Sequence, residues 1–381
     1  MADGWLDPAL PSLGRFLDDD AVRREAVAAG VLAPAVQVLA RRTMAWEPGR
    51  RCTATFALDG GSAPAARTAD VLVAEVGHDQ QLRFSYASED RALPGLALVL
   101  RGGARIVSYK PGMSCVVDLA DRRFAKVVPP GRLVGLQTTF GELGRMARDD
   151  DESPRVPVVL DTDLEHGVLV MEQIVGSELR RIADTAPQKA IQSSEQLGRS
   201  LAAMNRCRGL QLPTHRVRDD GHEVHRCLPA VRAAAPRIAD RMETLLQLAL
   251  SKMVAHQPAS VGPAHGALRT DQVLVAGGRT VLIDLDGACS APAGRDLANL
   301  SAYLWWRSVR RPAEAATLVG MATAALRGWQ TASGAAELDD RHSSAWRSLS
   351  LLKIAGRRYR TLAWSEWPLV PRLLDEAAIG L

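Results

Sequence analysis

Long apolar runs are missing from this sequence. No stretch reaches the roughly 18 consecutive apolar residues that a membrane-spanning helix needs. The N-terminus, MADGWLDPALPSLGRFLDDD, has neither the basic start nor the apolar centre of a secretory signal. We therefore expect a cytoplasmic protein without membrane contact.

Paired cysteines are missing as well. The cysteines are odd in number, scattered, and never spaced as CxxC: Cys52, Cys115, Cys207, Cys227 and Cys289. This pattern argues against a disulfide framework and against a structural zinc site.

Lysine is scarce, so nearly all of the positive charge is arginine. The net charge of +4 arises from acidic and basic residues spread along the whole length, without a basic block. We therefore expect no nucleic-acid partner. Scarcity also makes a lysine at a motif position informative, and the lysines are Lys110, Lys126, Lys189, Lys252 and Lys353.

What is present is the composition of a globular protein. Of the 381 residues, 47% are hydrophobic and 24% are charged, which is enough apolar material to bury a core. A chain of this length favours two lobes or two domains over a single core.

The order of patterns along the chain predicts an α+β fold. Helix-like residues open the chain, short apolar runs separated by Gly and Pro turns follow, and from Pro187 onward the pattern is mostly helical with one small hairpin. We expect an N-terminal helical extension (1–35), a β-rich lobe (36–173) and a helical lobe (174–381). In the first half, the candidate strands are 51–57, 70–76, 95–100, 104–109, 114–119 and 123–128, followed by a helix at 134–148.

A weak repeat lies inside the β-rich region. Trp46-Glu-Pro-Gly-Arg-Arg-Cys52 is echoed by Tyr109-Lys-Pro-Gly-Met-Ser-Cys115, and an alternating strand pattern follows each copy. Two copies are too few for a solenoid. Either a duplicated lobe element or a docking module for a partner protein would account for residues 36–90.

The segment richest in chemistry is His265-Gly-Ala-Leu-Arg-Thr-Asp-Gln272, which precedes an apolar hairpin ending in Ile283-Asp284. A loop, a strand, a tight turn and a returning strand would place Gln272 beside Asp284. Mg²⁺ prefers hard oxygen ligands and takes only one or two from protein, so the pair predicts a magnesium site.

This segment resembles the motif of the aminoglycoside phosphotransferase-like, protein-kinase-like superfamily, HGDxxxxN followed by IDxxxxxxGxxxxD. The spacing from His265 to Gln272 matches, as does Ile283-Asp284, and Asp296 stands where the family keeps an acid that braces the catalytic loop. The resemblance implies a two-lobed kinase-like fold with a β-rich N-lobe and a mainly helical C-lobe. It also implies ATP, or another nucleoside triphosphate, with Mg²⁺ as cofactors.

Two residues depart from the family motif. Ala267 replaces the catalytic aspartate, and Gln272 replaces the metal-binding asparagine. Gln keeps an amide oxygen, so metal binding can survive, whereas Ala keeps no base. The resemblance leaves a catalytic set of His265, Arg269 against the transferring phosphate, and Asp271, which with Asp286 is a candidate replacement for the missing base.

The resemblance also assigns nucleotide-binding residues in the first half. Lys126 matches the strand lysine that grips phosphates, and a lysine in an apolar strand needs a partner. We expect that partner to be Glu142, sixteen residues later in a predicted helix. Lys110 lies in a Pro-Gly hairpin where kinases cover the phosphates. The segment containing Met171, Glu172 and Gln173 resembles the linker whose backbone binds adenine.

The sequence therefore predicts an ATP-dependent phosphotransferase acting on a hydroxyl of a small molecule or peptide, and weakened by the loss of the base. The alternative is a pseudokinase that binds nucleotide or peptide as a partner subunit in a peptide-modifying natural-product pathway. Ala267 favours the alternative, whereas the enzyme is favoured by the retention of Lys126, Gln272, Asp284 and Arg269.

Overall fold

The computed structural model describes residues 7–36, 39–58, 71–101, 103–255, 261–333 and 340–381. Its N-lobe is built on an antiparallel five-stranded sheet in the order β5-β6-β7-β9-β8. The strands are β5 (Arg105–Lys110), β6 (Ser114–Asp118), β7 (Arg123–Val127), β8 (Val159–Asp163) and β9 (Val168–Glu172). The long helix α4 (Pro130–Asp149) joins β7 to β8 and packs on β9.

The C-lobe is mainly helical. Its helices are α5 (Leu179–Thr185), α6 (Pro187–Arg206), α7 (Val217–His225), α8 (Leu228–Ala234), α9 (Pro236–Ala255), α10 (Arg295–Arg310), α11 (Ala315–Ser333), α12 (Asp340–Arg360) and α13 (Val370–Ile379). Helices α6 and α11 approach so closely that a Cβ on Gly198 would lie 1.9 Å from the Ala325 carbonyl oxygen. Only glycine allows this crossing.

Short strands in the C-lobe carry the loops that face the N-lobe. The hairpin β12 (Val273–Ala276) and β13 (Arg279–Leu282) pairs with β10 (Ser177–Glu178). A second pair joins β11 (Val261–Ala264) to β14 (Cys289–Pro292). The chemistry-bearing loop 265–272 therefore leaves one small sheet and enters the other.

A separate N-terminal module precedes the N-lobe. It consists of α1 (Leu13–Phe16), α2 (Asp19–Ala28) and an antiparallel sheet of β1 (Leu39–Glu47), β2 (Arg51–Leu58), β3 (Val71–Gly77) and β4 (Leu82–Tyr86). A short helix, α3 (Leu96–Val99), then leads into β5. The β-rich first half is thus two sheets rather than one.

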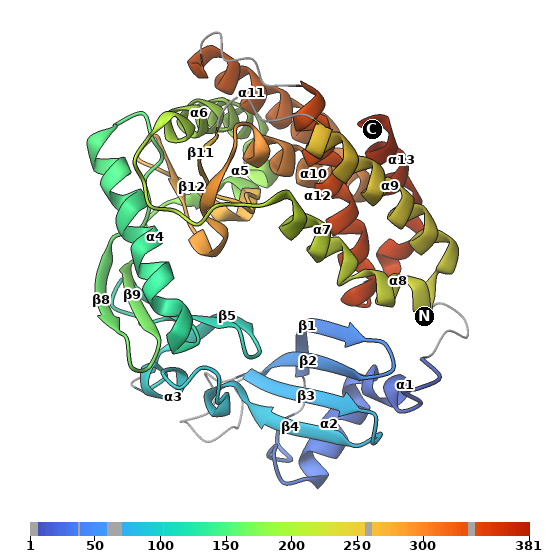
Figure 1. Ribbon diagram of the computed structural model, residues 1–381. Coiled ribbons are helices and arrows are strands. Elements are labelled where there is room, and N and C mark those ends of the chain that lie inside the picture. The colour runs from blue at the N-terminus through green and yellow to red at the C-terminus, as the bar shows by residue number, and fades with distance from the viewer. Residues whose placement is uncertain (1–6, 37–38, 59–70, 102, 256–260, 334–339) are drawn as a thin grey trace.

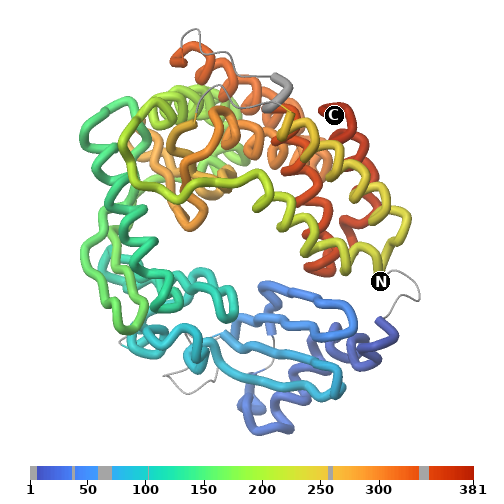
Figure 2. Tube along the Cα trace, viewed as in Figure 1, coloured from blue at the N-terminus to red at the C-terminus, as the bar shows by residue number. Residues whose placement is uncertain are grey.

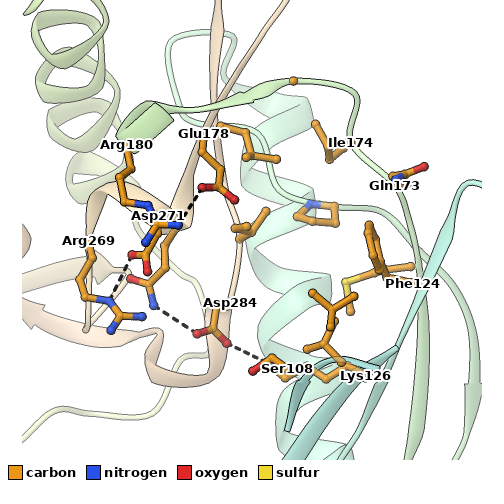
Figure 3. Close-up of a pocket in the computed structure, with 18 of the residues that line it drawn as sticks. Ser108, Phe124, Lys126, Gln173, Ile174, Glu178, Arg180, Arg269, Asp271 and Asp284 are labelled. Atoms are coloured by element: carbon orange, nitrogen blue, oxygen red, sulfur yellow. Dashed lines mark hydrogen bonds and ion pairs between the residues drawn. The ribbon is translucent and has the colours of Figure 1, made fainter. Parts of the chain in front are cut away.

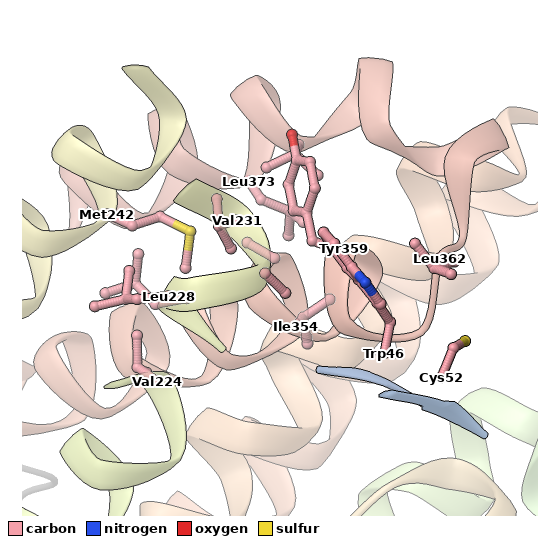
Figure 4. Packing of buried hydrophobic residues seen from close by; sticks show 14 of the residues in the cluster. Trp46, Cys52, Val224, Leu228, Val231, Met242, Ile354, Tyr359, Leu362 and Leu373 are labelled. Atoms are coloured by element: carbon pink, nitrogen blue, oxygen red, sulfur yellow. The ribbon is translucent and has the colours of Figure 1, made fainter. Parts of the chain in front are cut away.

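The N-terminal module connects both lobes, so that the chain follows a ring (Figures 1 and 2). Leu93 and Leu96 pack with β5–β7 of the N-lobe in one buried cluster. The other side of the module shares a larger cluster with α8, α9, α12 and α13. Figure 4 shows Trp46 and Cys52 of its strands close to Tyr359 and Leu362 of the C-lobe.

Most elements expected from the sequence occur, but the strands β1 and β4 were not expected, and one expected strand is a helix. Residues 95–100 were expected to form a strand, but Leu96–Val99 form a helical turn that buries Leu96. A short apolar run has too few residues for its period to separate helix from strand. All five cysteines are free in the structure. No helix in the described residues is long and apolar enough to cross a membrane.

Candidate active site

A cleft of about 700 Å³ lies between the N-lobe sheet and the loop 265–272. This volume is within the range of small-molecule sites. From the sequence-predicted set it brings together Lys110, Lys126, Met171, Glu172, Gln173, Arg269, Asp271, Gln272 and Asp284. Figure 3 shows several of these side chains pointing into one space.

Lys126 lies at the base of the cleft, and its side chain is only 3% exposed. Its ammonium nitrogen donates to Asp284 Oδ1 at 2.9 Å and also forms an ion pair with Asp286. The predicted pair with Glu142 is wrong. Glu142 instead accepts from Arg145 at 2.8 Å and from the Gln211 backbone N–H at 3.0 Å.

The error arises from the rotation of helix α4 about its own axis. Helix α4 turns Phe140 toward the cleft and Glu142 away from it, toward the loop after α6. Residues two apart on a helix point in different directions, so a correct helix assignment does not select the facing residue. Asp286, considered from the sequence only as a replacement for the missing base, takes the place assigned to Glu142.

Asp284 is held in an unusual backbone conformation, with φ 60° and ψ 55°. A non-glycine residue in the left-handed region is uncommon and persists where the surroundings enforce it. Burial would raise the pKa of Asp284, but the positive charge and hydrogen bond of Lys126, with smaller contributions from Lys110 and Gln272, hold that pKa well below its usual value. The carboxylate is therefore ionised and faces the cleft.

The predicted metal ligands lie together. Gln272 Nε2 donates to Asp284 Oδ2 at 3.1 Å, while Gln272 Oε1 is buried without a hydrogen-bond partner in the structure. An unsatisfied buried acceptor beside an ionised carboxylate is an environment that suits a hard cation. The residues present therefore fit a magnesium ion.

The loop preceding Gln272 is fixed by Asp296, as the family resemblance implied. Its two carboxylate oxygens accept from the backbone N–H groups of His265 at 2.7 Å and Gly266 at 2.9 Å. Gly266 also needs its φ of +82°, and a Cβ there would lie 1.9 Å from the Gly287 carbonyl oxygen. The loop is thus preorganised before any ligand arrives.

His265 supports the loop from inside the protein. Its side chain is completely buried, and Nε2 lies 2.8 Å from the Ile283 carbonyl oxygen. It links the loop to the segment that carries Asp284, and it does not line the cleft. The structure therefore places His265, predicted to be catalytic, behind the loop and outside the cleft lining.

Ala267 is exposed, and the acids that could replace its missing carboxylate already have partners. Asp271 lies 3.3 Å from Arg269 Nε, while Asp284 and Asp286 hold Lys126. Arg269 also stacks over the Tyr303 ring, 5.6 Å from its centroid. The loop therefore presents a cation where the sequence predicted one, without a free carboxylate at position 267.

Several lining residues were not predicted from the sequence. Ser108 and Phe124 come from the N-lobe strands, and Arg180 and Arg181 come from α5 just after the interlobe linker. The paired arginines were a usable signal, because they directly follow the linker segment. Ser108 and Phe124 gave none, since strand residues of these types are common on any sheet.

Two lobes with a cleft between them, lined by the predicted lysine, aspartate and glutamine side chains, define a kinase-like protein. A family model described as the phosphotransferase enzyme family matches residues 115–335, more than half of the chain. The chain belongs to this family.

The chain is similar to several solved structures, and the one with a TM-score above 0.5 supports the fold. Amicoumacin kinase hAmiN, in complex with AMP-PNP, Ca²⁺ and Ami, is 15% identical with a TM-score of 0.54, covering 71% of this chain and 87% of that one. Aminoglycoside phosphotransferase APH(3'')-Id from Streptomyces rimosus is 16% identical with a TM-score of 0.48, covering 68% and 98%. A glucosamine kinase is 17% identical with a TM-score of 0.44, covering 94% and 98%. No curated protein matches.

Proposed function

We propose that this protein binds ATP, or another nucleoside triphosphate, with Mg²⁺, and transfers phosphate slowly to a hydroxyl of a small molecule or peptide. The observation that supports this most is that Lys126, Gln272 and Asp284 meet in one cleft. Along the chain, Lys126 is 158 residues from Asp284, and Gln272 is 12 residues from it. Nothing in the local structure requires a buried lysine there, and burying its charge is costly without a partner.

Each group has a distinct task in this proposal. Lys126 and Lys110 hold phosphate oxygens, and the backbone of Met171–Gln173 receives the adenine. Asp284 and the unsatisfied Gln272 oxygen hold the metal, which when bound neutralises charge on the phosphates. Arg269 faces the transferring group. Phosphoryl transfer depends mainly on such positioning and charge neutralisation.

Ala267 sets the rate in this proposal. A positioned base typically contributes about 10² to 10⁴ in rate, and this chain has no carboxylate at that position. Since Asp271 and Asp286 are held by Arg269 and Lys126, we expect neither to replace it fully. The transfer is therefore slow but not eliminated.

The alanine at position 267 also favours a second candidate function. With Ala267 in place of the base, the protein would be a pseudokinase that binds nucleotide or peptide and serves as a partner subunit, for example in a peptide-modifying natural-product pathway. The N-terminal module would then be the docking element. Both candidates are placed in the cytoplasm, but only the enzyme requires the nucleotide cleft, because a partner subunit could bind peptide alone.

A thermal-shift titration with Mg·ATP tests whether the cleft binds nucleotide, as the enzyme requires. A ligand that binds only the native state raises stability by about 2.7 kcal/mol at a hundredfold excess over its Kd. We expect this shift in the wild type and its loss in Asp284→Ala, while the surface control Asp375→Ala keeps it. A wild type that ignores Mg·ATP would contradict the enzyme and favour a partner subunit that binds peptide.

A further inference from the structure

A segment before the first hairpin is repeated before the second. Residues 7–17 read DPALPSLGRFL and residues 90–100 read DRALPGLALVL, with six identical positions out of eleven. The two segments share their backbone hydrogen bonds: Leu10 N–H to the Asp7 carbonyl and Leu93 N–H to the Asp90 carbonyl are both 2.9 Å. Each segment continues into one helical turn, α1 and α3.

In the first copy, one carboxylate oxygen ties the segment to the β1–β2 hairpin. Asp7 Oδ2 accepts from the Trp46 indole N–H at 3.1 Å and from the Gly49 backbone N–H at 2.7 Å. The other oxygen accepts from the Ala9 N–H at 3.0 Å. Trp46 pairs with Cys52 across the turn.

The second copy repeats this arrangement group by group. Asp90 Oδ2 accepts from the Tyr109 hydroxyl at 2.9 Å and from the Gly112 backbone N–H at 2.7 Å, and Oδ1 accepts from the Ala92 N–H at 3.0 Å. Tyr109 pairs with Cys115, as Trp46 does with Cys52. Both turn glycines are left-handed, with φ of +69° at Gly49 and +68° at Gly112. The weak repeat is therefore a duplicated unit of segment, anchor and hairpin.

The two hairpins have different surroundings. The first buries Trp46, 1% exposed, in the cluster shared with the C-lobe helices. The second presents Ser108, Lys110 and Ser114 to the cleft. Lys110 and Asp284 line the same cleft, so this hairpin forms part of the wall that would face the phosphates of a bound nucleotide.

We propose that Asp90 is a positioning residue for nucleotide binding, because it fixes the hairpin that carries Lys110, whereas its duplicate Asp7 has only a structural role. This inference rests on the proposed function. A charged acceptor that holds a hydroxyl and a backbone N–H at once sets both the tilt and the turn of the hairpin. Without it, Lys110 would lose its fixed place in the wall of the cleft.

The duplicated anchor provides a matched control within the same chain. We would measure the Kd of Mg·ATP by thermal-shift titration for the wild type, Asp90→Ala and Asp7→Ala. Because misplacement of a positioning group by about an ångström has large effects, we expect Asp90→Ala to raise the Kd roughly tenfold. Asp7→Ala should leave the Kd unchanged and still lower the melting temperature of the free protein, because Asp7 is the more buried of the two.

If Asp90→Ala does not fold, two milder variants can replace it in the measurement of the Kd. Asp90→Asn keeps an acceptor oxygen and Tyr109→Phe removes one donor, so both should raise the Kd by less than Asp90→Ala. An unchanged Kd in every Asp90 and Tyr109 variant overturns the inference, and so does an equal rise in Asp7→Ala. If the wild type itself does not bind Mg·ATP, the proposed function fails first and the inference falls with it.

Discussion

At the scale of single residues, one lysine and one aspartate define the cleft. Lys126 is buried in a strand, and its ion pair with Asp284 crosses from the N-lobe to the C-lobe. The charge that lowers the pKa of Asp284 also keeps this carboxylate ready for a cation. Ala267, where the family has a carboxylate, lies in the same loop as Gln272, which contacts Asp284 of this ion pair.

Restoring a carboxylate at position 267 tests how much the alanine there lowers the rate of ATP turnover. Since Ala267 is exposed, Ala267→Asp can be accommodated, and we expect ATP turnover to rise by about 10²-fold or more, within the usual contribution of a base. Ala267→Asn, similar in size but not a base, is the control and should not accelerate turnover. A restored aspartate with no effect would favour the pseudokinase.

At the scale of elements, a buried network holds α7, α10 and α12 against the catalytic loop. Asp220 accepts from Lys353 at 2.5 Å and from Arg295 at 3.2 Å, and Arg295 donates to the Gly266 carbonyl at 2.6 Å. Burial would raise the pKa of Asp220, but His215, Lys353 and Arg295 hold that pKa far below its usual value. The C-lobe helices are thus connected directly to the loop that carries Ala267.

Replacing Asp220 should destabilise the protein strongly. Asp220→Asn leaves Arg295 and Lys353 buried without their counter-charge, and removing one partner of a buried pair costs about 3–5 kcal/mol. The control is Asp375→Asn, which breaks an exposed pair with Arg241 and should cost about 0–1 kcal/mol. Chemical denaturation measures both, and equal losses would contradict the importance of the network.

The depressed pKa values also predict a pH dependence. Because Asp220 and Asp284 have lower pKa values when folded, the unfolded chain binds more protons in acid. Their stabilising contribution is present above the unfolded pKa of about 4 and is lost as the pH falls below it. We expect the melting temperature to drop below about pH 4, and to drop less steeply in Asp220→Asn. Parallel curves would contradict this assignment.

At the scale of the whole molecule, the N-terminal module closes a ring between the lobes (Figure 1). Its cluster with α8, α9, α12 and α13 is the larger of the two that the module contributes to, and Trp46 is nearly inaccessible within it. The N-lobe is therefore joined to the C-lobe both by the linker after β9 and by the module. Unfolding of the module should expose the C-lobe helices.

Truncating Trp46 tests this coupling. Trp46→Ala should cost about 3–5 kcal/mol, as for other buried aromatic residues, and the protein should still unfold in a single transition. Far-UV circular dichroism and tryptophan fluorescence should give the same midpoint. Val134→Ala, at a site that is 60% exposed, is the control and should have little effect. Separate transitions would show that the module unfolds by itself.

The sequence by itself determined the family, the loop from His265 to Gln272 and the order of strands before helices, because motif spacing and hydrophobic periodicity are local properties. Only the tertiary structure decided that Asp286 rather than Glu142 pairs with Lys126, since the rotation of α4 is set by packing. It also showed that the weak repeat is a duplicated hairpin with an aspartate anchor in each copy. That anchor joins residues 39 positions apart in one copy and 19 in the other, from Asp7 to Trp46 and from Asp90 to Tyr109, so no fixed spacing along the chain could reveal it.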